Sequence, residues 1–344
     1  MYLEKLKRNL ILSEIKLKSD KRGRAHIMPQ VKILYASDFH GSTVVFKKFI
    51  NAGLIYGVDY LIYGGDLTGK AIIPIVEVER GMFKFELMGK KYNILENELS
   101  SHIERIENIG YYPLLVRKGE ESVLEDDKYM SAQFTHLMSE RIKKWLFFAK
   151  EKLRSSKVKL FLQLGNDDEP DLVNTIRACE DERIIYAEER IVQLEQNYEL
   201  VSLGYTNITP WKCPRDIDEE IIESKLDKLF SNVKNPNLTV LNTHCPPYDT
   251  NIDLAPKLDK DLRPIIASGG VVMEHVGCIS VRRIIEKYQP LVGLHGHIHE
   301  SRGIDKIKRT LVLNPGSDYN VGVLRAAYVV LERDKVKSYL LISG

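Results

Sequence analysis

The sequence predicts an α/β fold, and three features of its apolar pattern support this. Short, nearly continuous apolar runs recur along the chain, as in VKILYAS at 31–37. Such runs are typical of strands in sheets that are covered on both faces. Helical stretches separate the earlier runs, and this alternation indicates an α/β architecture. After residue 290 the runs follow one another without clear helices, which indicates a second, more antiparallel sheet.

The expected elements follow from this pattern in chain order. The expected strands are 31–37, 59–63, 158–164, 198–204, 238–243, 291–294, 310–313, 326–332 and 336–342. A helix is expected at 42–56. Between 69 and 157 the alternation breaks: we expect a hairpin at 75–92, a short helix at 97–108 and a long amphipathic helix at 126–154. We interpret about 70–157 as an insertion packed on the main domain, where it is a candidate to cover the active site.

The charge balance separates an N-terminal arm from the body of the chain. The 344 residues include 50 Lys and Arg against 48 Asp and Glu, a formal net charge of +2. Residues 1–24 hold eight of the basic and three of the acidic residues, so the remainder carries 42 against 45, or −3. We therefore predict a basic arm at 1–30 and a domain at 31–344. The mildly acidic body argues against a nucleic-acid surface.

Further features point to a protein of the cytoplasm. No apolar run approaches the roughly 20 residues that a membrane span needs, and the first 24 residues lack the pattern of a secretory signal. Cys179, Cys213, Cys245 and Cys278 form no C-x-x-C pair. Scattered thiols of this kind fit a reducing compartment, and we expect the cytoplasm.

Five short polar motifs each follow one of the expected strands. They are Asp38-Phe39-His40, Gly64-Gly65-Asp66, Gly165-Asn166-Asp167-Asp168, Thr243-His244 and Gly296-His297-Ile298-His299. In open α/β sheets, ligands bind beyond the carboxyl ends of the strands. We therefore expect the five motifs to converge at one edge, although they are far apart in the sequence.

The side chains of these motifs are suited to metal ions. They offer carboxylates, imidazoles and an amide oxygen but no thiolate, a set that suits Mn, Fe, Zn, Ni or Mg. The seven candidate ligands are Asp38, His40, Asp66, Asn166, His244, His297 and His299. Seven ligands are too many for one ion and fit two ions that share a bridge. Asp66 is the natural bridge because a carboxylate has two oxygens and a negative charge.

The order D-x-H, G-D, G-N, H, G-H-x-H resembles the calcineurin-like metallophosphoesterase superfamily over about residues 31–342. Asn314-Pro315-Gly316-Ser317 is similar to a further family feature. The resemblance implies a two-sheet β sandwich flanked by helices (αββα) with a binuclear metal centre at the sheet edge. It places Asp38, His40, Asp66 and His299 on one ion, and Asp66, Asn166, His244 and His297 on the other.

The resemblance implies a phosphoric ester hydrolase that acts on a small-molecule phosphate ester. Two cations clamp the phosphoryl group, and a bridging hydroxide attacks phosphorus in line. The segment GGDLTGK at 64–70 is similar to a branch of predicted phosphodiesterases, which favours phosphodiesters. We expect two divalent ions, manganese foremost, with iron, zinc, nickel or magnesium as alternatives.

The third motif departs from the family pattern. That pattern reads G-N-H-[ED], and here Asp167 stands where the family has a histidine that contacts the phosphoryl group or protonates the leaving group. Asp167 and His295 are therefore the candidate catalytic residues, with His275 as a further candidate for the acid. Arg302 is the candidate substrate-binding residue.

Two alternatives remain open on the sequence alone. Some members of the fold lost the motif histidine and became scaffolds, so a non-catalytic metal-binding interaction module is the main alternative. The other is a nuclease, for which the basic arm is the only support.

Overall fold

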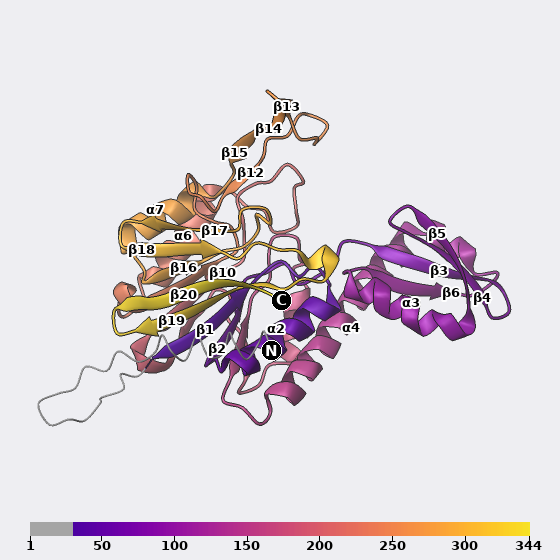
Figure 1. Cartoon of the computed structure of the whole chain (residues 1–344), viewed down its shortest axis with the longest axis horizontal. Coiled ribbons are helices and arrows are strands. Elements are labelled where there is room, and N and C mark those ends of the chain that lie inside the picture. Colours follow the sequence, from indigo (N-terminus) through magenta and orange to yellow (C-terminus); the bar gives the residue numbers. More distant parts are fainter. Residues whose placement is uncertain (1–29) are drawn as a thin grey trace, which may run out of the picture. The chain divides into compact units, whose positions relative to one another are not determined.

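Two mixed sheets of six strands each stack face to face in the computed structural model, which describes residues 30–344. The basic arm predicted at 1–30 therefore lies outside the described residues, apart from Gln30. The expected two-sheet sandwich flanked by helices is confirmed, and Figure 1 shows both sheets in the same part of the molecule.

The first sheet combines four parallel strands with antiparallel pairing at one edge. Its strands in spatial order are β20 (Lys335–Ser343), β19 (Arg325–Glu332), β1 (Val31–Ala36), β2 (Tyr60–Tyr63), β7 (Lys159–Leu162) and β8 (Ile184–Tyr186). The strands from β1 to β8 are parallel neighbours, whereas β19 runs antiparallel to β1. The residues of β1 and β2 are nearly all buried because both faces of the sheet are covered.

The second sheet is also mixed, with parallel strands at its centre. Its strands in spatial order are β17 (Gly303–Ile307), β18 (Thr310–Asn314), β16 (Val292–Leu294), β11 (Thr239–Thr243), β10 (Glu199–Leu203) and β9 (Ile191–Gln193). The four central strands are parallel, and the two outer strands are antiparallel to their neighbours. A second sheet is thus present as expected, but the expectation that it is the more antiparallel one was wrong, because its central strands are parallel. Strand β19 instead pairs with β1, where its buried residues are covered on both faces.

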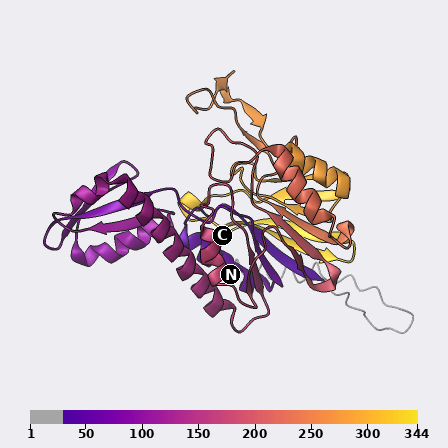
Figure 2. The ribbon, with the colours of Figure 1, turned by 180° about the vertical axis from the view of Figure 1, so that it is seen from behind.

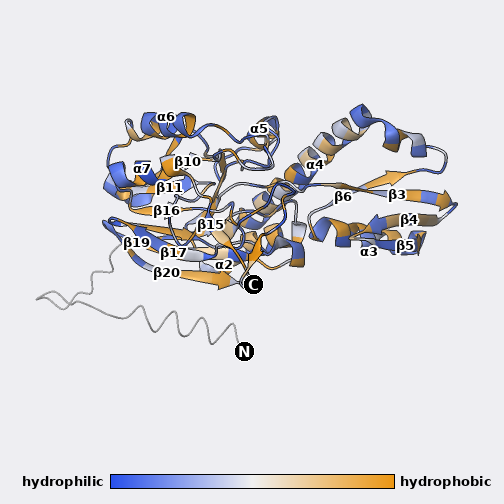
Figure 3. Cartoon of the chain, turned by 90° about the horizontal axis from the view of Figure 1, so that it is seen from above, coloured by the Kyte–Doolittle hydropathy of each residue, from blue (hydrophilic) through white to orange (hydrophobic). Residues whose placement is uncertain are grey.

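Helices cover the outer face of each sheet. They are α2 (Thr43–Tyr56), α4 (Asp127–Leu153), α5 (Leu172–Ala178), α6 (Glu219–Phe230) and α7 (Ile279–Tyr288). Figure 2 shows α6 and α7, in salmon and orange, together on the second sheet, and Figure 3 shows them outside its strands. One apolar cluster, including Ile33, Ile62 and Val240, fills the space between the sheets. A second cluster, which includes Ile222 and Val281, lies between the second sheet and these two helices.

The segment expected as an insertion, about 70–157, contains a small sheet of its own. Its strands in spatial order are β5 (Lys90–Leu95), β4 (Met82–Leu87), β3 (Ile72–Glu79) and β6 (Tyr112–Val116), accompanied by α3 (Glu96–Asn108) and the 3₁₀ helix η1 (Glu121–Glu125). The expected hairpin is thus the centre of a four-stranded sheet. One face packs on α3, and the other packs on η1 and the start of α4. The pattern did not reveal β6 because it is short and contains Pro113, which a strand at a sheet edge tolerates.

The remaining short elements lie in loops. They are β12 (Leu254–Pro256), β13 (Ile266–Ala267), β14 (Gly270–Val271), β15 (Met273–His275), and the 3₁₀ helices η2 (Glu195–Asn197), η3 (Pro236–Leu238) and η4 (Tyr319–Val321). In Figure 1 the strands from β12 to β15 form an arm that projects from the region of α7. Within residues 30–344, no helix combines the length and the apolar character needed to cross a bilayer.

Arg141 ties the long helix α4 to the loops at the sheet edge. Its buried guanidinium donates to the carbonyl oxygens of Gly41 (2.7 Å) and Tyr111 (2.9 Å). The guanidinium also lies over the ring of Tyr112, with its carbon 4.4 Å from the ring centroid. Because Gly41 follows directly after His40, this contact connects the 70–157 segment with the first polar motif.

We predict that Arg141→Met destabilises the protein by about 3 kcal/mol, since it leaves buried carbonyl groups without donors. Thermal and urea unfolding measure this change. Lys144→Met is the matched control because Lys144 is exposed on the same helix. A loss for Arg141→Met no larger than that of the control would contradict the prediction.

Candidate metal centre

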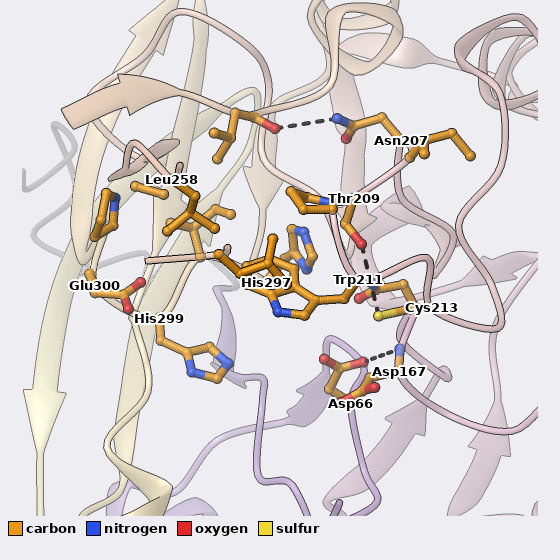
Figure 4. A pocket seen from close by; sticks show the side chains of 18 of the residues that line it. Asp66, Asp167, Asn207, Thr209, Trp211, Cys213, Leu258, His297, His299 and Glu300 are labelled. Atoms are coloured by element: carbon orange, nitrogen blue, oxygen red, sulfur yellow. Dashed lines mark hydrogen bonds between the residues drawn. The ribbon is translucent and has the colours of Figure 1, made fainter. Parts of the chain in front are cut away.

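The five polar motifs meet beyond the carboxyl ends of five strands from both sheets. Strands β1, β2 and β7 lead into the motifs at 38–40, 64–66 and 165–168, and β11 and β16 lead into those at 243–244 and 296–299. Central strands of each sheet are parallel, so their carboxyl ends share one edge. Figure 4 shows Asp66, Asp167, His297 and His299 directed into the same cavity.

One group of candidate metal ligands consists of Asp38, His40 and His299. Their ligand atoms all lie within 4.8 Å of one another. The Nε2 atoms of the two histidines are 3.0 Å apart, and Asp38 Oδ1 lies 3.4 Å from His299 Nε2. The three side chains therefore point at one common centre.

A second group consists of Asp66, His244 and His297, whose ligand atoms also lie within 4.8 Å of one another. Asp66 Oδ2 lies 3.3 Å from His244 Nε2 and 3.6 Å from His40 Nε2. Because His40 belongs to the first group, the carboxylate of Asp66 lies between the two groups. This is the position that a bridging ligand requires.

Asn166 is oriented so that its amide oxygen is free. Its Nδ2 donates to Asp216 Oδ1 at 2.8 Å, while its Oδ1 is buried and has no hydrogen-bond partner. Asp216 Oδ1 also accepts from Thr206 Oγ1, and its other oxygen accepts from the amides of Thr209 and Cys213. Asp216 thus fixes the side chain of Asn166 and the loop that precedes it. No motif pointed to Asp216.

A backbone carbonyl sets the tautomer of His244. Its Nδ1 lies 2.8 Å from the carbonyl oxygen of Gly64 and must donate to it. Nε2 therefore carries the lone pair when the ring is neutral, and it is buried with no hydrogen-bond partner. This arrangement, in which one ring nitrogen is held by an outer partner, is typical of metal-binding histidines.

The backbone is strained at four of the seven candidate ligands. Asp38, His40, Asp66 and His297 have positive φ angles of 60°, 41°, 57° and 67°. Non-glycine residues rarely adopt this conformation, and it concentrates at functional sites. Hydrogen bonds between the loops hold it: the amides of Asp38 and His40 donate to the carbonyl oxygens of Gly65 and Asp66.

Asp168 connects the second motif with the third. Its carboxylate accepts from the amides of Leu67, Thr68 and Gly165 and from Thr68 Oγ1. Burial and the charge of Asp66 raise the pKa of Asp168 to about 6. Gly165 is also required sterically, since a Cβ there would overlap the side chain of Asp66.

The electrostatics of the site favour a bound cation. Burial opposes the ionisation of Asp38 and Asp66, but hydrogen bonds and charges from His299 and His244 outweigh it and hold both pKa values low. Burial likewise opposes a proton on His244, but the charges of Asp66 and Asp38 raise its pKa to about 10. The two buried carboxylates thus favour positive charge between them. Divalent ions would provide that charge.

Two of the other candidate histidines, His40 and His297, are already in the neutral form that binds metals. Burial lowers the pKa of His40 to about 3 and that of His297 to about 4, so both rings are neutral. Asn166 Oδ1 has no hydrogen-bond partner, and His244 Nε2 would become available once a bound ion displaced its proton; together these nitrogen and oxygen atoms suit divalent ions. Asp38, His40 and His299 with Asp66 would hold one ion, and Asn166, His244 and His297 with Asp66 would hold the other.

The structure does not bring His295, Arg302 or His275 into the cavity. His295 is fully buried, with its Nδ1 2.9 Å from Thr243 Oγ1, and burial lowers its pKa to about 3. Arg302 is exposed and lies outside the cavity lining. His275 Nδ1 lies 2.7 Å from Asp253 Oδ1. Of the residues expected to act on substrate, Asp167 is the one that faces the cavity.

The cavity beside the donors has a volume of about 820 Å³. Its walls come from the loop at 207–213 and from the arm at 255–276, and Asn207 Nδ2 donates to the carbonyl oxygen of Val276 between them. From the 70–157 segment only Lys70 lines the cavity, so the segment does not form its cover. Trp211 is 62% exposed and provides an aromatic wall, which Figure 4 shows.

The sequence comparisons assign no activity to the chain. No family model matches the chain. The uncharacterized protein MJ1162 of Methanocaldococcus jannaschii is 38% identical over 147 residues, which are 42% of this chain. The match spans 60% of the length of that relative.

The comparisons with solved structures establish the fold. Two crystal structures align over 91% and 92% of this chain and 99% of each of theirs, with TM-scores of 0.52 and 0.50 and identities of 18% and 14%. The second is TT1561 of Thermus thermophilus. A novel archaeal phosphodiesterase aligns over 91% of this chain and all of its own, with 12% identity and a TM-score of 0.37. These likenesses show the fold alone, a mixed α/β architecture that spans nearly the whole of both chains.

We predict that Asp216→Asn lowers the affinity for Mn²⁺ by about ten- to a hundredfold, the usual effect of losing an outer partner of a metal ligand. The single remaining oxygen cannot serve both Asn166 and the loop amides. Isothermal titration with Mn²⁺ measures the change. Asp218→Asn is the control, because Asp218 is exposed two residues further on; equal affinities in both variants would refute the role given to Asp216.

Proposed function

We propose that the protein is a phosphoesterase that depends on two divalent metal ions and that phosphodiesters are its substrates. The observation that carries the proposal is the position of the Asp66 carboxylate between the two groups of donors, 3.3 Å from His244 Nε2 and 3.6 Å from His40 Nε2. Two such ions supply Lewis acidity and lower the pKa of water for attack on phosphorus. We propose manganese first among the ions that these nitrogen and oxygen ligands suit, with iron, zinc, nickel or magnesium as alternatives.

The residues of the chain perform supporting tasks in this proposal. Asp66 and Asp38 provide the negative charge that holds the ions, and Gly64 and Asp216 orient two of the donors. The cavity next to the donors gives the phosphoryl group access to them. We propose that Asp167 contributes to binding of the phosphoryl group, because it faces this cavity beside the candidate ligands.

The charges of the cavity favour diesters over monoesters. Asp259, Glu274 and Glu300 line it, whereas Lys70 is the only Lys or Arg in its lining among the described residues. A phosphodiester carries one negative charge and a monoester up to two. Since like charges repel, a carboxylate-rich cavity disfavours the second charge of a monoester.

The main alternative is a non-catalytic metal-binding scaffold of the same fold, which the loss of the motif histidine at Asp167 suggests. Hydrolysis of p-nitrophenyl phosphate and its bis-ester with added Mn²⁺ or Ni²⁺ separates the two. Turnover supports the enzyme, whereas bound metal without turnover supports the scaffold. A cytoplasmic location belongs to the same proposal, because all four cysteines are free.

We predict that Asp66→Asn reduces the bound metal from two ions per chain and lowers turnover of bis-p-nitrophenyl phosphate by more than about a hundredfold, which exceeds the usual effect of an outer partner. The variant keeps the shape of the side chain and removes its charge. Metal analysis of the purified protein and steady-state kinetics measure the two effects. A chelator should abolish turnover in the unchanged protein, and added Mn²⁺ should restore it.

The control is Asp334→Asn, which removes a carboxylate from an exposed turn. If Asp66→Asn bound two ions and turned over like this control, Asp66 would not be the bridge and the two-ion proposal would fail.

We predict that Trp211→Ala raises the KM for bis-p-nitrophenyl phosphate by about tenfold, because an aryl group loses its contact with the indole ring. The KM for methyl p-nitrophenyl phosphate should rise less. Tyr339→Ala is the control, since Tyr339 is a comparably exposed aromatic residue outside the cavity lining. Equal effects of Trp211→Ala on both esters would show that Trp211 does not contact the second aryl group, which methyl p-nitrophenyl phosphate lacks.

A further inference from the structure

Asp167 occupies a corner of the cavity where the family pattern has a histidine. Its amide donates to Asp66 Oδ1 at 3.0 Å, a bond that Figure 4 shows as a dashed line. Its Oδ2 lies 3.7 Å from His40 Nδ1, and its side chain is 24% exposed. An unpaired carboxylate in this corner would repel an anionic phosphate ester.

Lys70 neutralises this carboxylate from the opposite side. Its Nζ lies 2.9 Å from Asp167 Oδ2. Burial lowers the pKa of Lys70, but the charge of Asp167 outweighs it, and the pKa lies above its usual value. The ammonium group is therefore charged at neutral pH.

The backbone before Lys70 is held in place while the side chain stays accessible. The amide of Gly69 donates to Tyr112 Oη at 3.0 Å, and Gly69 packs so closely on the carbonyl of Gly110 that a Cβ would not fit. The side chain of Lys70 is nevertheless 55% exposed and lines the cavity. The backbone of Lys70 is thus held in place, while its ammonium group is paired with Asp167 and accessible from the cavity.

The ion pair with Asp167 does not use all the N–H groups of the Lys70 ammonium. The ammonium group carries three N–H donors, and Asp167 Oδ2 can take one of them. The others are available to a ligand in the cavity, and no other Lys or Arg in the described part of the chain lines that cavity.

We propose that Lys70 binds the non-bridging oxygens of the substrate phosphoryl group and that Asp167 positions it there. The pair takes the place of the family's histidine: Asp167 occupies its position in the sequence, and Lys70 supplies the cationic donor. This assignment rests on the proposed phosphoesterase function. It makes the anionic ester group of the substrate, whatever its alcohol, the part that Lys70 recognises.

The test uses Lys70→Met in the full chain loaded with Mn²⁺. Its affinity for inorganic phosphate, measured by isothermal titration, should fall about tenfold, the usual value of one hydrogen bond to a charged group. The KM for bis-p-nitrophenyl phosphate should rise by a similar factor with a smaller change in kcat. Lys70→Arg should recover most of both, and the affinity for Mn²⁺ should stay unchanged. Lys84→Met, on an exposed position of β4, is the control.

The outcomes separate the two levels of the proposal. If the unchanged protein bound Mn²⁺ and phosphate but Lys70→Met bound phosphate as tightly, with the same KM, the role of Lys70 would be wrong and the proposed function would stand. If Lys70→Met lost Mn²⁺ affinity, Lys70 would be part of the metal site, and its assignment to substrate would be wrong. If the unchanged protein bound neither Mn²⁺ nor phosphate, both the function and this inference would fail.

Discussion

The site depends on two buried carboxylates that must stay ionised in the same small volume. Asp38 and Asp66 are both almost completely buried, and each lies within 4 Å of an imidazole nitrogen of His244. Like charges at this separation and burial are unfavourable unless positive charge lies between them. In the protein without ions, a proton on His244 provides part of it, which is why the pKa of that ring is raised to about 10. Divalent cations would offset the two negative charges more completely. The other candidate ligands surround the place where such cations would bind.

The loops that carry the candidate ligands adopt strained backbone conformations. Four candidate ligands, Asp38, His40, Asp66 and His297, have positive φ angles, and hydrogen bonds between loops keep them there. A second layer of contacts then fixes the loops themselves. Asp168 joins the loops after β2 and β7, and Arg141 on α4 holds the carbonyl group beside the first motif. The geometry of the donors is therefore set before any ion binds, as a metal site with closely defined distances requires.

The local pattern of the sequence predicted the α/β class and the convergence of the motifs, whereas the two-sheet sandwich was implied by the family resemblance. Apolar runs indicate buried strands, and the carboxyl ends of parallel strands share an edge wherever the strands pair. Partners that depend on tertiary contact were not predictable. Asp216 orients Asn166 from 50 residues away, and Lys70 meets Asp167 across two loops. The cavity walls at 207–213 and 255–276 come from irregular loops, which carry no periodic signal. His295 follows a strand beside a motif, but adjacency in sequence does not decide which way a side chain points.

The most direct measurement is anomalous diffraction at the manganese edge from crystals grown with Mn²⁺. We predict two peaks about 3.5–4 Å apart, the usual separation in two-metal sites, with the carboxylate of Asp66 bound to both ions and Asn166 Oδ1 bound to one. A single peak, or peaks away from these side chains, would contradict the claim that Asp66 joins two metal ions.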